Sequence, residues 1–299
     1  MAALDTAGVR QGGAGGVANA VARLLRDPFT VAGLSIYAVL IVVAVFADQL
    51  MTHDPGEILF RANGRVASNQ PPSALYLLGT TNLGRDVYSQ LIGGSRIALV
   101  VGFTAAICVA AFGTLIGLLA GYFGGKLDAI LMRLADLALA IPFLPFAIVL
   151  AGFSRSSTTN VIVAVVLLLW PNTARVIRAQ VLTVKERAYV EAARVTGASD
   201  ARILFVHVAP NILPLTFLYG SVAIGWAILT EAAVSFVGFG DAKNISWGYM
   251  LQDAFVSQAL SRGSWYWFIP PGLCIILVVI AGFFIARGAE DVLFPKLRS

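Results

Sequence analysis

Charged residues are scarce in this chain, and their scarcity excludes a soluble globular protein. Lys, Arg, Asp and Glu together supply 12% of the 299 residues, whereas soluble domains carry about 25%. Hydrophobic residues supply 58%, and the mean hydropathy is +0.82. A chain of this composition has too few polar side chains to cover a surface that faces water. It is therefore predicted to be an integral membrane protein.

Cysteine and histidine are also rare, which argues against a disulfide framework and against a zinc site. The two cysteines, Cys108 and Cys274, both lie within apolar runs, where a thiol usually packs as a small hydrophobic side chain. The two histidines, His53 and His207, fall on opposite sides of the predicted membrane. Since they cannot share a zinc ion, we expect no metal site in this chain.

The sequence contains no motif for ATP binding or for hydrolysis. A P-loop requires the pattern GxxxxGK[ST]. The nearest string, around GYFGGKL, has Ala120 in place of the first glycine and Leu127 in place of Ser or Thr. The patterns GxSxG and HExxH are absent as well. We therefore expect no enzymatic activity and no cofactor in the chain itself.

Long apolar runs are abundant and predict an all-α protein with six transmembrane helices. Each run is long enough to cross the roughly 30 Å of hydrocarbon in a bilayer. Trp265, Tyr266 and Trp267 precede the last run and are expected to form an aromatic belt at the membrane surface. The predicted spans lie at about 29–50, 95–122, 129–153, 158–178, 212–238 and 269–285.

The distribution of basic residues orients this topology. If the N-terminus is cytoplasmic, fourteen of the 21 Lys and Arg residues lie in cytoplasmic segments. This excess favours that orientation, because cytoplasmic loops are enriched in Lys and Arg, and it explains the net charge of +5 without nucleic acid. The chain then comprises a cytoplasmic tail at 1–28, the first transmembrane helix at 29–50, an extracytoplasmic loop at 51–93, a five-helix core at 94–288 and a cytoplasmic tail at 289–299.

The extracytoplasmic loop at 51–93 has three open interpretations. Its Pro, Gly and Asn content predicts irregular structure with one short amphipathic helix near 86–92. The loop is a plain connection, a cover for a gate or a docking site for a partner. Its sequence does not separate these alternatives.

Glycine and proline residues within the spans predict two kinds of helix contact. Gly113, Gly117 and Gly121 repeat every four residues and so share one face of a helix. In a membrane such a stripe lets a second helix approach closely, which predicts a helix-packing surface. Pro142 and Pro145 interrupt the third span. They either kink it, which we favour, or free backbone carbonyls that line a pathway.

Two acidic side chains lie within or near the spans. Glu231 falls inside the fifth span, where an ionisable group costs free energy and usually faces protein or water. A substrate contact, a gate hydrogen bond and a packing hydrogen bond all remain open, and we favour packing or gating. Asp136 lies one turn after Arg133, a spacing that predicts an ion pair between them.

The polar segment at 184–212 stands between two strongly apolar spans and predicts two helices with a break. Ala192 and Ala193 are good helix formers, and Gly197 is a helix stop. Ser199 offers a cap for a second helix, and Pro210 is expected to end or kink it. A pair of helices held at one side of a membrane is suited to binding by another protein.

This segment resembles the EAA loop of permease subunits in bacterial ABC importers. The string that carries the resemblance is EAARVTGASDARILFVHVAPN. More narrowly, the chain looks like the C-type permease of the oligopeptide, dipeptide and nickel family over roughly residues 20–298. The supporting strings are LLRDPFTVAGL with HDPGE, LGTTNLGRDVYSQLIGGSRIAL, GLLAGYFGGKLDAILMRLADL, LTEAAVSFVGFG and SWGYML.

The resemblance implies a fold, a site and a set of partners. The fold is the type I importer permease, with a cytoplasmic coupling helix that docks on an ATPase. The partners are a homologous permease, two cytoplasmic ATPase subunits that bind ATP and Mg, an extracytoplasmic binding protein and bilayer lipid. Short peptides are the favoured cargo, and nickel complexes or another small solute are the alternative. A stand-alone ion-coupled carrier is the less favoured class of protein. The implied coupling residues are Glu191, Ala192, Ala193, Gly197, Ala198, Ser199 and Asp200.

Overall fold

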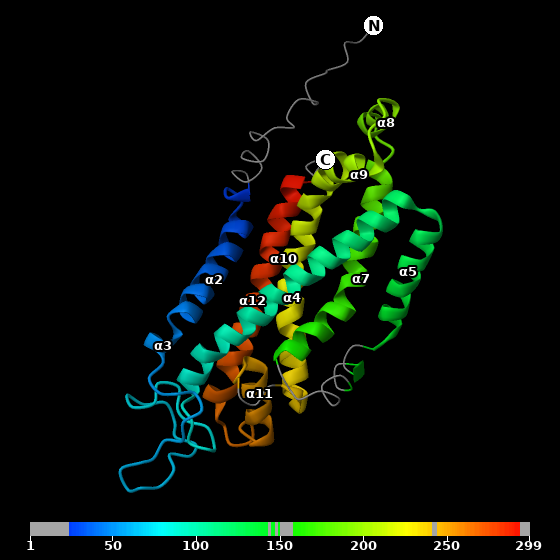
Figure 1. Ribbon diagram of the computed structural model, residues 1–299. Helices are drawn as coiled ribbons and strands as arrows, with labels where there is room; N and C mark the ends of the chain where they lie inside the picture. The colour runs from blue at the N-terminus through cyan, green and yellow to red at the C-terminus, as the bar shows by residue number, and fades with distance from the viewer. Residues whose placement is uncertain (1–23, 143–144, 147–148, 150–157, 241–243, 294–299) are drawn as a thin grey trace.

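A computed structural model describes residues 24–142, 145–146, 149, 158–240 and 244–293. These residues form helices that run up and down through one bundle (Figure 1). In chain order the elements are α2 (Pro28–Val45), α3 (Ala47–Leu50), α4 (Val87–Phe123), α5 (Gly125–Ala140), α7 (Thr158–Val184), α8 (Ala188–Val195), α9 (Asp200–Arg202), the π-helix η1 (Ile203–Val208), α10 (Ala209–Val234), the π-helix η2 (Ser235–Phe239), α11 (Trp247–Val256) and α12 (Trp265–Leu293).

Five stretches in the described part of the chain are long and apolar enough to cross a membrane. The chain is therefore an all-helical membrane-spanning protein. The remaining predicted span, at 129–153, lies partly outside the described residues, and α5 covers its beginning. The five stretches are Pro28–Val45, Val87–Phe123, Thr158–Val184, Asp200–Phe239 and Trp265–Glu290.

The second span begins further toward the N-terminus than the hydrophobic run suggests. Asp86 caps α4, because its carboxylate accepts a hydrogen bond of 3.0 Å from the backbone N–H of Ser89. From that cap α4 runs for 37 residues without interruption. The prediction of a separate amphipathic helix near 86–92 is thus wrong, since those residues are the first turns of the spanning helix.

Pro210 was expected to end or kink the second helix, and the structure shows that it does not end it. Helical structure continues from Asp200 through α9, η1 and α10. Pro210 stands in the first turn of α10, directly after the π-helical turns of η1. A π-turn shifts the backbone hydrogen-bond register, which accommodates the N–H that proline lacks.

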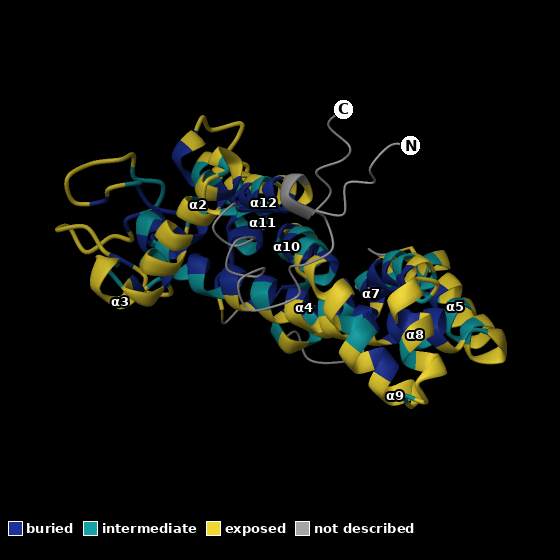
Figure 2. Cartoon of the chain, turned by 90° about the horizontal axis from the view of Figure 1, so that it is seen from above, coloured by how far each residue is buried: buried dark blue, intermediate teal, exposed yellow. Residues whose placement is uncertain are grey.

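The bundle has two distinct sides. In Figures 1 and 2, α2 and α12 lie at one side and α5, α7 and α8 at the other, with α4 crossing between them. On the first side the helices touch backbone to backbone, because a Cβ at Gly33 of α2 would lie 2.6 Å from the carbonyl oxygen of Ala281. The start of α12 is equally tightly packed. Trp267 is fully buried and Tyr266 nearly so, which leaves Trp265 exposed, so the predicted aromatic belt is mostly core.

The segment between α3 and α4 folds back onto the end of the bundle. Two isolated antiparallel bridges, Phe60 with Val66 and Thr80 with Asp86, are its only strand-like pairings among the described residues. The Thr52 hydroxyl donates a hydrogen bond of 2.8 Å to the Asp86 carboxylate. The segment is thereby tied to the cap of α4.

Candidate coupling segment and intramembrane polar residues

The α8–α9 segment projects from one end of the bundle (Figure 1). Among the predicted coupling residues, Ala193 and Ala198 are half-buried. The others are exposed: Glu191, Ala192, Gly197, Ser199 and Asp200. Val195, the last residue of α8, is 83% exposed, which is unusual for a β-branched apolar side chain. The segment therefore presents mixed apolar and charged groups outward.

The turn between α8 and α9 has the hydrogen bonds of a Schellman motif. The N–H of Gly197 donates to the carbonyl of Arg194, and the N–H of Ala198 donates to the carbonyl of Ala193, each at 3.0 Å. Gly197 has φ of +80°, a left-handed conformation that glycine adopts at little cost. Ser199 then caps α9 by accepting from the N–H of Arg202. The break is thus fixed in shape.

The same segment is anchored firmly in the bundle. Val190 of α8 is fully buried in an apolar cluster that includes residues of α4, α7, η1 and α10. The Tyr122 hydroxyl at the end of α4 donates a hydrogen bond of 2.7 Å to the Asp200 carboxylate. Lys185 Nζ donates one of 2.9 Å to the carbonyl of Gly121. The α8–α9 segment is therefore joined to the long helices by apolar packing and by hydrogen bonds.

Sequence reasoning missed these anchors. Val190 carries a weak signal, as a single β-branched apolar residue in a polar stretch. The Tyr122–Asp200 bond joins positions 78 residues apart, and no spacing in the sequence predicts it.

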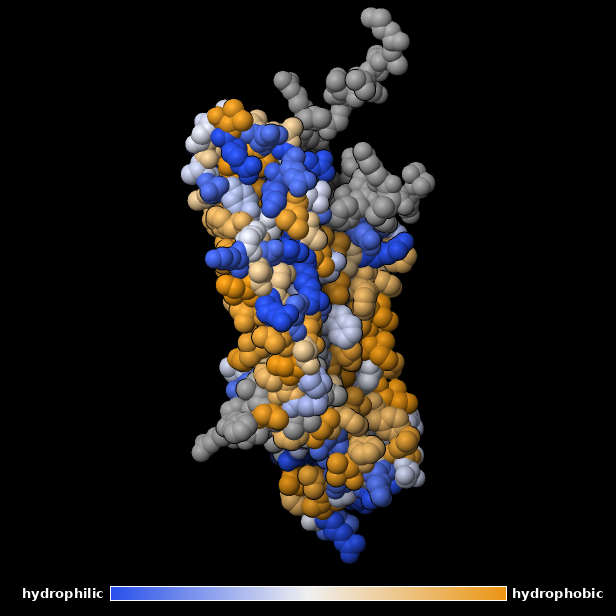
Figure 3. All heavy atoms as spheres, turned by 90° about the vertical axis from the view of Figure 1, so that its right-hand side faces the viewer, coloured by the Kyte–Doolittle hydropathy of each residue, from blue (hydrophilic) through white to orange (hydrophobic). Residues whose placement is uncertain are grey.

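Ion pairs hold α5 against α7. Arg178 binds the Asp128 carboxylate with two hydrogen bonds of 2.5 Å, and Arg175 contacts Asp136 at 2.5 Å. The predicted pairing of Asp136 with Arg133 is wrong, because the neighbouring helix brings a guanidinium closer than the same helix does. The Arg175 and Asp136 side chains are 47% and 51% exposed. Figure 3 shows hydrophilic residues on this face among a largely hydrophobic surface.

The glycine stripe of α4 faces α7. A Cβ at Gly113 would lie 2.7 Å from Thr173 Cβ, and one at Gly117 would lie 2.6 Å from the carbonyl oxygen of Ala174. One at Gly121 would lie 2.8 Å from Val181 Cβ. Real Cβ atoms do not approach other atoms so closely, so each position accepts only glycine without movement of α7.

Glu231 is buried near the opposite end of the bundle from α8. Its side chain is 4% exposed, and Oε1 accepts a hydrogen bond of 2.6 Å from the Ser235 hydroxyl. The side chain of Ser246, just before α11, also hydrogen-bonds it. The carboxyl group therefore connects α10 to the cap of α11. It lies next to η2, and π-helical turns are frequent at functional sites.

The two prolines of the third span follow the end of α5. Pro142 and Pro145 are exposed, and α5 ends just before them, with Ile141 as its C-cap. Residues 143–144 and 147–148 lie outside the described residues, so the kink itself is not described. Among the described residues, no group of three His, Cys, Asp or Glu side chains is placed to hold a metal ion.

The described residues thus form a bundle of membrane-spanning helices with an anchored, outward-facing helical turn, and comparison with known proteins shows the class to which the chain belongs. Residues 113–299 match the family described as the binding-protein-dependent transport system inner membrane component. Residues 17–72 match the N-terminal transmembrane domain of oligopeptide transport permease C. The chain belongs to the binding-protein-dependent transport permeases, which are membrane subunits of ABC transporters and not ATPases.

Curated relatives match over most of their length. A glutathione transport system permease of Pectobacterium atrosepticum is 36% identical over 93% of this chain and 90% of its own. A dipeptide transport system permease of Alkalihalophilus pseudofirmus is 33% identical over 93% and 89%. An oligopeptide transport system permease of Bacillus subtilis is 33% identical over 94% and 90%.

Proposed function

We propose that this chain forms half of the translocation pathway of an ATP-driven importer for short peptides, and that α8 couples the pathway to a cytoplasmic ATPase. The observation that carries the proposal is an exposed helix whose base, Val190, is fully buried in the cluster joining α4, α7 and α10. Peptides are favoured as cargo because similar permeases are named for dipeptides, oligopeptides and glutathione. Nickel complexes are the alternative cargo.

The proposed complex contains a second, homologous permease chain, two ATPase subunits that bind ATP and Mg, and an extracytoplasmic binding protein. It resides in the bacterial plasma membrane with both termini cytoplasmic. The chain then crosses the membrane six times, the third crossing comprising α5 and the residues that follow it. The excess of Lys and Arg on the side of α8 supports this orientation.

Coupling requires that the ATPase contact α8 differently in its two states. A partner that binds both states equally shifts no equilibrium, however tightly it docks. The Schellman turn at Gly197 and the Tyr122–Asp200 bond prevent α8 from rotating freely on its base. An ATPase that closes would therefore move α4 and α10 together with α8 and so open one end of the pathway while it shuts the other.

The pathway side of the bundle is proposed to be the face of α5 and α7. Charged side chains at membrane depth face protein or water and avoid lipid. The half-exposed Arg175–Asp136 pair lies on that face. Glu231 would act at the extracytoplasmic end, where its bonds to Ser235 and Ser246 hold α11 against α10 as part of a gate.

The test is co-purification and transport with a charge reversal on α8. We expect Glu191→Lys to insert normally but to weaken ATPase docking by about thirtyfold or more, because reversing a charge in the core of an interface costs about 2 kcal/mol or more. Glu186→Lys is the matched control, since Glu186 is exposed and precedes α8. Peptide uptake into proteoliposomes should fall in step with docking.

Two results would overturn the proposal. Equal recovery of the ATPase with both variants, together with undiminished uptake, would exclude α8 as the coupling helix. Uptake by the purified chain without any ATPase would make it a stand-alone carrier.

A further inference from the structure

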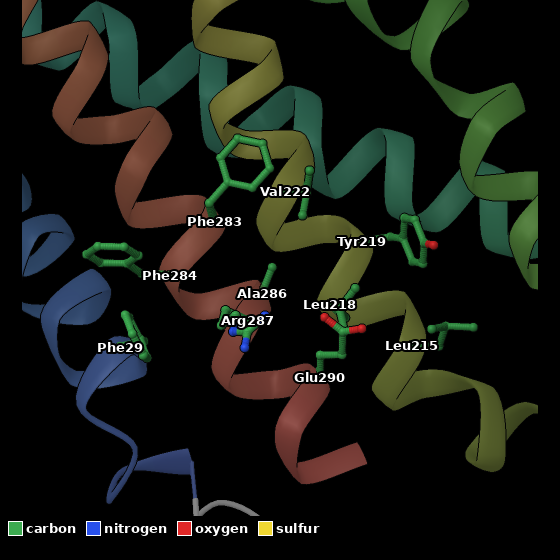
Figure 4. A pocket seen from close by; sticks show the side chains of 10 residues that line it. All are labelled: Phe29, Leu215, Leu218, Tyr219, Val222, Phe283, Phe284, Ala286, Arg287 and Glu290. Atoms are coloured by element: carbon green, nitrogen blue, oxygen red, sulfur yellow. The ribbon is translucent and has the colours of Figure 1, made fainter. Parts of the chain in front are cut away.

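An apolar cavity opens where α10 and α12 diverge. The two helices touch at Gly282, where a Cβ would lie 2.9 Å from the carbonyl oxygen of Ser221. From there towards the end that carries α8 they border an open groove of about 540 Å³, within the range of pockets for small-molecule ligands. Phe29 of α2 lines it from a third helix (Figure 4). The cavity is thus a wedge between three helices.

The wedge has an apolar body and a charged rim. Leu218 and Val222 of α10 and Phe283 of α12 line its body. Arg287 and Glu290, one turn apart on α12, line its rim (Figure 4). Both are exposed, and neither forms an ion pair with any other described residue. The rim therefore offers one positive and one negative group side by side.

The rim lies at the end of the stretch of α12 that is long and apolar enough to cross a membrane, Trp265–Glu290. Trp265 begins α12 at the opposite end and is exposed; exposed tryptophans are enriched at membrane surfaces. Arg287 follows 22 residues later along the helix, a rise of about 33 Å. The hydrocarbon core of a bilayer is about 30 Å thick. In a bilayer with Trp265 at one surface, this rise would bring Arg287 and Glu290 to the other surface and the apolar body of the wedge among the acyl chains.

We propose that the wedge binds a phospholipid with a primary-amine headgroup, such as phosphatidylethanolamine. The Arg287 guanidinium would hold the phosphate, for which its planar donors are suited. The Glu290 carboxylate would accept hydrogen bonds from the ammonium group, and an acyl chain would fill the space beside Leu218 and Val222. A rim of net zero charge complements a zwitterionic headgroup better than an anionic one.

The position of the wedge favours lipid over a protein helix. Its lining residues come from α2, α10 and α12, and in Figure 2 α2 and α12 lie away from α5 and α7. This choice rests on the proposed function, in which the α5–α7 face with its half-exposed Arg175–Asp136 pair lines the pathway and meets the partner chain. The α2–α12 side is then left to the bilayer. The lipid site is independent of the cargo of the transporter.

The test is native mass spectrometry of the complex that contains the full chain. The complex is stripped of lipid in detergent and exposed to equal amounts of phosphatidylethanolamine, phosphatidylcholine and phosphatidylglycerol with identical acyl chains. We expect about fivefold preference for phosphatidylethanolamine over phosphatidylcholine, because both headgroups carry a positive charge but only the primary ammonium donates hydrogen bonds to the Glu290 carboxylate, a contact worth about 1 kcal/mol. Glu290→Gln should reduce the preference to less than about twofold, because the headgroup loses its acceptor charge.

A tryptophan pair separates this site from lipids bound elsewhere. Leu218→Trp fills the wedge and should remove one bound lipid per chain. Leu213→Trp, at an exposed position of the same helix outside the wedge, should keep it. The proposal is overturned if the wild type shows no headgroup preference or if Glu290→Gln leaves the preference unchanged. It is equally overturned if a photo-reactive group at position 218 attaches to another protein chain of the complex.

Discussion

The hydroxyl of Tyr122 donates a hydrogen bond of 2.7 Å to the carboxylate of Asp200. The bond joins the last turn of α4 to the first residue of α9, and so ties the longest helix among the described elements to the proposed coupling segment. Tyr122 is otherwise packed in the same apolar cluster as Val190. Removing the hydroxyl therefore tests coupling without opening the core.

Tyr122→Phe should lower the efficiency of coupling. The variant loses one hydrogen bond to a charged group, worth about 1.5–3 kcal/mol in the interior and less where water reaches the carboxylate. We expect ATP hydrolysis to continue while peptide transported per ATP falls severalfold. Tyr189→Phe is the control, because Tyr189 is exposed on α8 and is not in the apolar cluster. Unchanged transport per ATP in Tyr122→Phe would contradict the role given to this bond.

Gly197→Ala should destabilise the coupling segment by about 1 kcal/mol through backbone strain alone. The residue has φ of +80°, and a Cβ added there would have no atom of a non-adjacent residue within 4 Å, so clashes with neighbours play no part. Gly272→Ala is a matched control, since its surroundings are equally open and its φ is not positive. Proteolysis of the α8 turn in the purified complex measures the difference. If the α8 turn were equally resistant to proteolysis in the two variants, backbone strain at position 197 would be contradicted.

Gly117→Leu should separate α4 from α7. A Cβ at this position would lie 2.6 Å from the Ala174 carbonyl oxygen, and overpacking of this kind costs about 1–3 kcal/mol or more. We expect less assembled complex at equal expression, measured by size-exclusion chromatography. Ala111→Leu, at an exposed position of α4, should assemble normally. Equal yields of the two variants would mean that the stripe tolerates bulk.

Asp253→Asn should stabilise the end of the bundle that carries α11 at neutral pH. Burial raises the pKa of the Asp253 carboxyl, although Arg85 opposes the shift, and one carboxyl oxygen is buried without a hydrogen bond. A folded-state pKa above the unfolded one means that stability falls as pH rises through the interval between them. The wild type should therefore melt lower than the variant at pH 7.

The difference between Asp253→Asn and wild type should disappear below the ordinary pKa of aspartic acid. There the carboxyl group is protonated in both the folded and the unfolded states, and no charge is buried. Thermal melts of the purified complex across acid and neutral pH measure this. If the difference in melting temperature between the two proteins did not change with pH, burial of the Asp253 charge would not be its cause.

The sequence predicts local structure well where the signal is local. The apolar runs correspond to five described spans, and the small residues and caps around Gly197 correspond to a helix, a turn and a helix. The prediction of an ion pair failed where the partner side chain lies on another helix. Asp136 pairs with Arg175, 39 residues away, and not with Arg133 one turn away, because helix packing and not spacing decides which charge is nearest.

Other features depend on tertiary contacts that no window of sequence contains. Tyr266 and Trp267 were predicted at the membrane surface but are buried. The residues near 86–92 have the composition of a separate amphipathic helix, yet Asp86 caps them into α4. The wedge between α10 and α12 arises from how far two helices separate, which depends on the contact between Gly282 and Ser221, far apart in the sequence.

The length of α4 makes it a mechanical link across the whole bundle. The helix is 37 residues long and contains no proline, so it is a single stiff rod of about 55 Å. One end is fastened to the outer loop through Asp86 and Thr52, and the other to the coupling turn through Asp200. In the importer proposed above, a binding protein that contacts the segment between α3 and α4 would act on the ATPase along this one helix, without a relay of side chains. A proline placed in the middle of α4 would kink the helix. Both ends would stay folded, but movement of one end would no longer move the other.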